Sequence, residues 1–185
     1  MPNQLVKNWF GNRFSDLHPL LQQLHLEGGA LKGKVNISYG NGIAGILGQR
    51  LARKMTLPNA GEHELLVQIS HDDEYLHWSR SFGNSNVVHS LFKPVGSVER
   101  GYWLETTGPV AMRLTVDVRN GGWYWRCLKV CLFGIPIPVW LVPESNAYKV
   151  IVNGRYKFHV SFSFPFFGEL VRYEGMLDAL GDGDS

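Results

Sequence analysis

The most constraining feature of the sequence is a predicted β-hairpin between Arg155 and Leu177. Apolar and polar residues alternate along both of its arms, which a turn at residues 165–168 joins. The apolar positions are Tyr156, Phe158, Val160, Phe162 and Phe164 on the first arm and Val171, Tyr173 and Leu177 on the second. A hairpin with one aromatic face does not fold alone in water. The rest of the chain must therefore supply a larger sheet.

Further alternating segments precede this hairpin and provide that sheet. The dipeptides Asn120-Gly121 and Asn153-Gly154 are strong hairpin-turn signals. We predict a mainly β (α+β) fold, in which an antiparallel meander of about nine or ten strands rolls into a closed or half-open barrel. A β-sandwich is the alternative, because the spacing of turns does not distinguish the two.

Two helices are predicted near the N-terminus, where apolar residues recur at helical spacing. The first follows Ser15 or Asp16 and ends at Gly28, and the second follows Asn41. We expect both to cover one end or one face of the barrel. The second helix begins within a G-x-G-x-x-G sequence at residues 40–45, but the repeated βα units of a dinucleotide fold are missing. These glycines instead predict close packing of the helix on the sheet.

Size and composition indicate a single domain, residues 1–185, with its core at about 14–180 and a polar tail at 181–185. A net charge of +2, with both signs interspersed, gives no basic patch of the kind that binds nucleic acid. Cys127 and Cys131 are too far apart on one strand for a disulfide. The N-terminus lacks a signal-peptide core, and the apolar run at 132–142 is too short to span a membrane. We therefore expect a cytoplasmic protein.

A candidate ligand site is predicted on the inward face of the sheet. Arg80 shares its strand face with Leu76, Trp78 and Phe82, so its guanidinium must meet acceptors in an apolar interior. It is interpreted either as an anchor for the acidic head group of a ligand, or as a structural partner of an acid such as Glu105. Together with Trp78, Phe82, Trp103 and Trp125 it forms the predicted ligand-binding set.

A candidate interaction loop follows from the apolar, proline-rich segment at residues 133–143. Its Ile135, Ile137 and Trp140, together with Phe166 and Phe167 of the hairpin turn, are side chains of the kind that contact a membrane interface or a partner protein. Packing of the same residues in the core is the alternative interpretation.

No metal site, cofactor or catalytic residue is predicted. The cluster of His71, Asp72, Asp73, Glu74 and His77 is explained by a turn between two strands. His63-Glu64 begins an H-E-x-x-H sequence that Val67 breaks. His159 lies on the polar face of its strand, where we expect it to be at the surface.

Several short motifs, spread over roughly Phe14 to Leu180, resemble the family called domain of unknown function 4166. The motifs are Leu17-His18-Pro19, Trp78-x-Arg80-x-Phe82-Gly83, Gly108-Pro109, Gly134-Ile135-Pro136-Ile137-Pro138 with Pro143, Phe158-x-Val160, and Pro165-x-x-Gly168-x-Leu170-Val171-x-Tyr173-x-Gly175-x-Leu177. The resemblance implies no known activity and no catalytic residues. Members are often fused to saccharopine-dehydrogenase-like reductases. Because that reductase is absent from this chain, a separately encoded reductase is a possible partner.

Three hypotheses about function remain. The leading one is a non-catalytic module whose interior binds an apolar or amphipathic, lipid-like small molecule. The second is an interaction domain that docks on a reductase or a membrane surface, as a peripheral contact without a transmembrane span. The third is an enzyme with no recognisable motif, which two or more convergent titratable side chains in the interior would favour.

Overall fold

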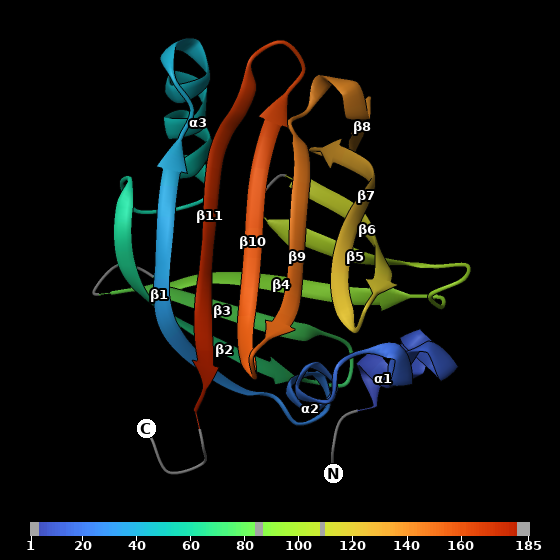
Figure 1. Ribbon diagram of the computed structural model, residues 1–185. Coiled ribbons are helices and arrows are strands. Elements are labelled where there is room, and N and C mark those ends of the chain that lie inside the picture. The colour runs from blue at the N-terminus through green and yellow to red at the C-terminus, as the bar shows by residue number, and fades with distance from the viewer. Residues whose placement is uncertain (1–3, 84–86, 108–109, 181–185) are drawn as a thin grey trace.

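The computed structural model describes residues 4–83, 87–107 and 110–180, in which ten antiparallel strands close into a barrel (Figure 1). The Gly108-Pro109 motif and the predicted tail lie outside these residues. The barrel strands are β1 (Gly29–Tyr39), β2 (Gly61–His71), β3 (Leu76–Phe82), β4 (Val87–Val95), β5 (Tyr102–Thr107), β6 (Val110–Arg119), β7 (Gly122–Leu132), β9 (Glu144–Val152), β10 (Arg155–Phe164) and β11 (Gly168–Ala179). An eleventh strand, β8 (Ile135–Ile137), pairs with β7 outside the ring.

The barrel is an up-and-down meander in which each strand pairs with its neighbour in the chain. Pairing of β6 with β7, of β7 with β9 and of β1 with β11 closes the ring. The predicted closed barrel is therefore confirmed, and the sandwich is excluded. The turn signals also hold, since Asn120 and Asn153 adopt positive φ angles at the hairpins they were expected to form.

Glycines at inward positions permit the strong curvature of the seam between β1 and β11. A Cβ atom on Gly33 would lie 2.3 Å from the carbonyl oxygen of Met176, and one on Gly175 would lie 2.3 Å from that of Lys34. Because no side chain fits at either position, these two strands bend tightly as the sheet closes.

The N-terminal segment covers one end of the barrel, which we call the helical end (Figure 1). It comprises α1 (Leu5–Phe10), a 3₁₀ helix η1 (Gly11–Asp16) and α2 (Pro19–Glu27). Trp9 fixes the segment by donating its indole N–H to Val95 O at 3.3 Å, and its own carbonyl accepts from Val98 N at 2.8 Å. Helix α1 was missed in the sequence, because its six residues are too few to show a helical period.

Helix α3 (Gly42–Lys54) begins after Asn41 as predicted, but it does not cover an end of the barrel. It packs lengthwise on the outside of β11 and β1 (Figure 1). The expectation of two covering helices is therefore corrected, since the described residues form three α-helices, of which α1 and α2 cover one end and α3 covers the outer face of β11 and β1. Its contact surface consists of the small residues Ala44, Gly45, Gly48 and Ala52, which confirms the close packing predicted from the glycines.

The hairpin end, opposite the helical end, carries the β10–β11 turn and the β7–β8 hairpin with its short 3₁₀ helix η2 (Val139–Leu141) (Figure 1). The segment at 133–143 was expected to be irregular, whereas Ile135–Ile137 pair with Val130–Leu132 as a short edge strand. Its prolines do not interrupt this pairing, because an edge strand leaves one side of its backbone unpaired. Among the described residues, no helix is long and apolar enough to cross a membrane.

Candidate functional site

The inner face of the barrel differs between its two halves. At the helical end, aromatic side chains are completely packed: Trp103 and Trp123 have no exposed surface and lie against Trp9 and Phe10 of α1. Further along the same face, inward-facing side chains are only half-buried. They are Trp78, Arg80, Met112, Trp125, Cys127, Phe158, Val160 and Phe162. The interior is therefore fully packed around Trp103 and Trp123 and half-buried around these side chains, while Leu65, Phe82 and Val171 near the opposite end are buried as well.

A polar cluster, which we call the lumen cluster, comprises Arg80, Ser90, Glu105 and Tyr173; Arg80 and Glu105 are half-buried, whereas Ser90 and Tyr173 are buried. Arg80 donates one guanidinium N–H to the Ser90 hydroxyl and another to the Tyr173 hydroxyl at 3.4 Å. Ser90 in turn hydrogen-bonds the Glu105 carboxylate. Adjacent strands β3, β4 and β5 supply the first three side chains, and β11 supplies the tyrosine from across the interior.

Burial dominates the electrostatics of the lumen cluster. It raises the pKa of Glu105, and the attraction of Arg80 and the hydrogen bond from Ser90 act against this shift. Burial likewise raises the pKa values of Tyr173 and Cys127. The cluster therefore holds one fixed cation beside a carboxyl group that is partly biased toward its neutral form.

Three donors close to this region have no protein partner among the described residues. They are Arg80 Nε, Trp78 Nε1 and the Tyr156 hydroxyl. Each belongs to an inward-facing side chain, by the register of β3 with β2 and of β10 with β11. Buried polar groups in proteins are nearly always hydrogen-bonded, so these donors call for an acceptor; the indole N–H groups of Trp103 and Trp123 at the packed helical end are unpaired as well.

A second inner group, which we call the lysine cage, surrounds Lys149 with His25, Trp78, Trp123 and Trp125. Lys149 Nζ lies 4.0 Å from the ring centre of Trp123, 4.2 Å from that of Trp78 and 5.8 Å from that of Trp125. It donates to His25 Nε2 at 2.6 Å, and no carboxylate pairs with it in the described part of the chain. With 3% of its surface exposed, Lys149 is the most buried cationic side chain described.

The hydrogen bonds fix the protonation state of His25. Its Nδ1 donates to the carbonyl oxygen of Leu21 at 2.7 Å, so Nε2 carries a lone pair and accepts from Lys149. Burial, reinforced by the repulsion of Lys149, lowers the pKa of His25. Burial also lowers the pKa of Lys149, while the faces of the indole rings favour its cation and oppose that shift.

The structure brings together three of the five predicted ligand-binding residues. Trp78, Arg80 and Trp125 line the half-buried region, whereas Trp103 is packed against Trp9 at the helical end and Phe82 is 3% exposed. The Arg80 and Glu105 pairing considered from the sequence is present, with Ser90 between them. Sequence reasoning missed Lys149 and His25, because the alternation of β9 is weak and a lysine in a strand normally faces solvent.

The predicted interaction loop lies at the surface of the hairpin end. The exposed fractions are 65% for Ile135, 74% for Trp140 and 50% for Phe167, and Phe166 is fully exposed. Ile137 is half-buried. These side chains are therefore not part of the core, which was the alternative interpretation.

The other polar groups singled out in the sequence have structural roles. Asp72 caps its turn by accepting from Glu74 N at 2.8 Å and Tyr75 N at 2.7 Å, and it also binds His77 at 2.6 Å. His159 pairs with Glu174 at 2.9 Å and is more buried than expected for a surface residue. Within the described ranges, no group of three His, Cys, Asp or Glu side chains could hold a metal ion.

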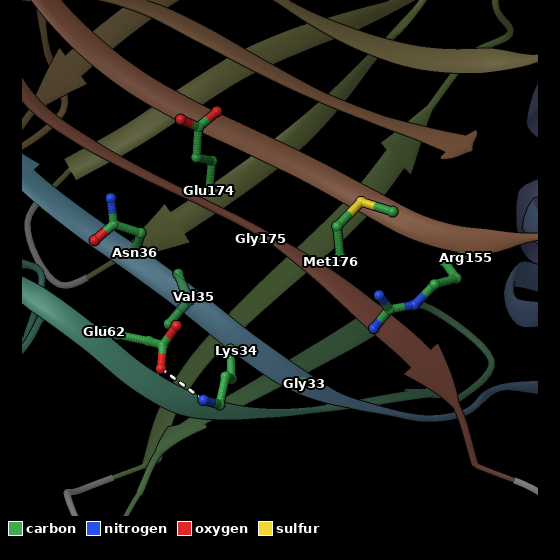
Figure 2. A pocket seen from close by; sticks show the side chains of 9 residues that line it. All are labelled: Gly33, Lys34, Val35, Asn36, Glu62, Arg155, Glu174, Gly175 and Met176. Carbon is green, nitrogen blue, oxygen red and sulfur yellow. Dashed lines mark hydrogen bonds and ion pairs between the residues drawn. The ribbon is translucent and has the colours of Figure 1, made fainter. Parts of the chain in front are cut away.

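A surface depression of about 380 Å³ lies on the outer side of β1 and β11 (Figure 2). The Lys34–Glu62 ion pair at 2.7 Å crosses one side of it, and Met176 and Arg155 line another. Because its charged groups are exposed and paired with each other or with neighbours, we do not assign it a function.

Comparisons with known proteins give a family and no activity. No curated protein matches the sequence. A crystal structure of a protein with unknown function from the DUF3598 family of Nostoc punctiforme aligns with a TM-score of 0.45 and 11% sequence identity, covering 90% of this chain and 49% of that chain. The chain thus spans about half the length of that protein. The family described as domain of unknown function (DUF4166) matches residues 17–177, so the chain belongs to the DUF4166 family.

Proposed function

We propose that the barrel is a binding module for one small amphipathic molecule of lipid-like character. The apolar body of the ligand lies among the half-buried side chains of β7 and β10, such as Trp125, Phe158 and Val160. Its head group accepts hydrogen bonds beside Arg80. Small-molecule sites in barrels are typically apolar pockets with a few fixed polar groups.

The observation that carries this proposal is the combination of accessible apolar walls with unpaired donors. Trp78 and Arg80 of β3, and Phe158, Val160 and Phe162 of β10, are half-buried, although Leu76 and Phe82 at the two ends of β3 and Tyr156 at the helical end of β10 are buried. The donors without protein partners, on Trp78, Arg80 and Tyr156, all require an acceptor. A carboxylate, carbonyl or ether oxygen on the ligand satisfies them.

An enzymatic role is less well supported by the same groups. Arg80, Glu105 and Tyr173 do converge, as the third hypothesis required. However, the Ser90 hydroxyl is engaged by both Arg80 and Glu105, so neither it nor the carboxylate is left free as a nucleophile or base. Such mutually fixed groups suit the orientation of a head group.

The proposal is tested by titrating the full chain with a fluorescent dansyl-labelled undecanoic acid and by native mass spectrometry without detergent. We expect a one-to-one complex that Arg80→Met weakens by about tenfold, as loss of a charged hydrogen bond predicts. Arg119→Met, an exposed arginine on the outer surface, is the matched control. The proposal is abandoned if the wild type binds no probe and carries no extra mass, or if the two variants weaken binding equally.

Exposure of the hairpin end supports a second candidate function, docking on another surface. Trp140 and Phe166 extend from separate turns and are at least 74% exposed. Exposed aromatic side chains clustered at one end of a protein are characteristic of interaction sites. This role is compatible with ligand binding in the interior.

A further inference from the structure

We propose that the hairpin end, together with the outer surface of α3, is a docking face for an anionic lipid bilayer. This inference deepens the docking function proposed above by naming the partner and adds α3, which the sequence did not place in an interaction surface. The proposed docking face comprises Ile43, Ile46, Arg50, Arg53 and Lys54 of α3, the β10–β11 turn at Phe166 and Phe167, and the β7–β8 hairpin with Trp140.

Helix α3 is amphipathic in an unusual sense, because its fully buried residues are small and two of its large apolar residues, Ile43 and Ile46, face outward. Ile43 is 62% exposed and Ile46 is 56% exposed. Positions 43, 46, 50 and 53 follow helical spacing and form one outer stripe, which is apolar in the first half of the helix and basic in the second. Burial in the barrel therefore does not explain the two isoleucines.

The basic residues of this stripe have no acidic partner. Arg50, Arg53 and Lys54 are exposed, and none of them forms an ion pair with another described residue. The sequence contains no acid between residues 40 and 61, between 118 and 143, or between 155 and 168. The segments that meet at the hairpin end are therefore apolar and cationic up to Glu144 and Glu169, which follow at the starts of β9 and β11; Glu169 is paired with Arg172 at 3.3 Å.

The elements of the docking face also lie at the same end of the molecule. Figure 1 shows the first turn of α3, the β10–β11 turn and the β8–η2 segment at the end opposite to α1 and α2. Apolar side chains that enter the acyl boundary, with basic side chains beside them at the level of the head groups, match the chemistry of an anionic bilayer surface. A protein partner would require acidic complementarity to the same cations, and it becomes an outcome of the test.

The test is co-sedimentation of the full chain with two kinds of vesicle, one of phosphatidylcholine alone and one that also contains about 30% phosphatidylserine. We expect binding to the anionic vesicles that weakens with salt, and that drops by about tenfold or more in the triple variant R50E/R53E/K54E. The matched control, K7E/K32E/R100E, makes the same charge change at exposed residues of the helical end and should bind within about threefold of wild type.

A second variant distinguishes insertion of apolar side chains into the bilayer from electrostatic attraction of the basic side chains to anionic lipids. I43S/I46S keeps every charge, and it should lose binding at high salt, where the apolar contribution dominates. Circular dichroism and native mass spectrometry on each variant check the fold and the interior ligand, which should be unchanged. Absence of vesicle binding by the wild type, or equal loss in both charge-reversal triples, would overturn the docking face. If the wild type binds anionic vesicles but carries no ligand in its interior, the binding module is contradicted and the docking face is supported.

Discussion

At the scale of single residues, the most unusual feature is the buried lysine without an acid. An isolated ammonium in an apolar interior is costly, so Lys149 is either neutral or stabilised by the three indoles and His25. In both cases it ties β9 to α2, since His25 belongs to the helix that covers the barrel. The residue therefore acts as an internal anchor.

The pH dependence of stability distinguishes the two states of Lys149. Burial lowers its pKa in the folded chain, whereas the unfolded chain keeps a value of about 10.4. Between these values the unfolded state binds more protons, so the free energy of unfolding rises with pH by up to about 1.4 kcal/mol per pH unit. We expect the difference in unfolding free energy between wild type and Lys149→Met, measured by urea unfolding, to grow as the pH rises toward the pKa of the unfolded lysine. Parallel curves for the two proteins would show that the indoles keep the lysine charged.

Residue types alone could predict part of the site. The alternation around Arg80 correctly indicates an inward guanidinium, and Glu105 follows as an acid on an inward position. Lys149 was not predicted, because the alternation of β9 is weak and only the register with Trp123 places its side chain inside. Cross-strand register depends on the closed ring, which no local pattern encodes.

At the scale of secondary-structure elements, strands and turns were predictable and the roles of the helices were not. Most strands carry a period-two pattern, so local sequence decides their existence; β8 and β9 are the exceptions. The apolar stripe of Ile43, Ile46, Leu47, Leu51 and Met55 suggested that α3 buries its large residues. The structure packs Leu51 and Met55 partly against the core, leaves Ile43 and Ile46 exposed, and fully buries only small residues of the helix. Small residues occupy the buried contact because they allow the helix backbone to approach β11 closely, which large side chains prevent.

This close approach makes a quantitative prediction about Gly48. An added Cβ atom would lie 1.8 Å from the carbonyl oxygen of Leu170, so Gly48→Ala must displace α3. We expect a loss of about 1–3 kcal/mol in the free energy of unfolding, as found for overpacked sites. Gln49→Ala, at the exposed neighbouring position, should change stability by less than about 0.5 kcal/mol. Chemical denaturation of both variants measures the difference, and equal stabilities would contradict the packing described for this helix.

At the scale of the whole molecule, the two ends of the barrel are built for different purposes. The helical end is filled by an aromatic cluster. The ring centres of Trp9 and Trp103 are 5.4 Å apart, and those of Phe10 and Trp123 are 4.8 Å apart. The hairpin end instead exposes its aromatic side chains. Filling one end stabilises the fold, and the binding roles that we propose fall on the half-buried interior and the exposed turns.

Two tryptophans, one at each end, test this division. Trp9 is 2% exposed and Trp140 is 74% exposed. We expect Trp9→Ala to cost about 3–5 kcal/mol of unfolding free energy, as for other buried aromatic residues. Trp140→Ala should cost less than about 0.5 kcal/mol, since it removes no core contact. Thermal and urea unfolding measure the stability of both variants. Similar losses of unfolding free energy would mean that both ends contribute to the core.

Because the last strand closes the barrel against the first, both ends of the described chain lie at the helical end, and this position decides where a tag or a fused domain is attached. Helix α1 begins, and β11 finishes, at the helical end of the barrel (Figure 1). A tag, a tether or a fused domain on either side of the described chain therefore starts from that end. The docking face points away from any such attachment, so a sensor chip that holds the protein by a terminal tag presents this face to vesicles in the flowing solution.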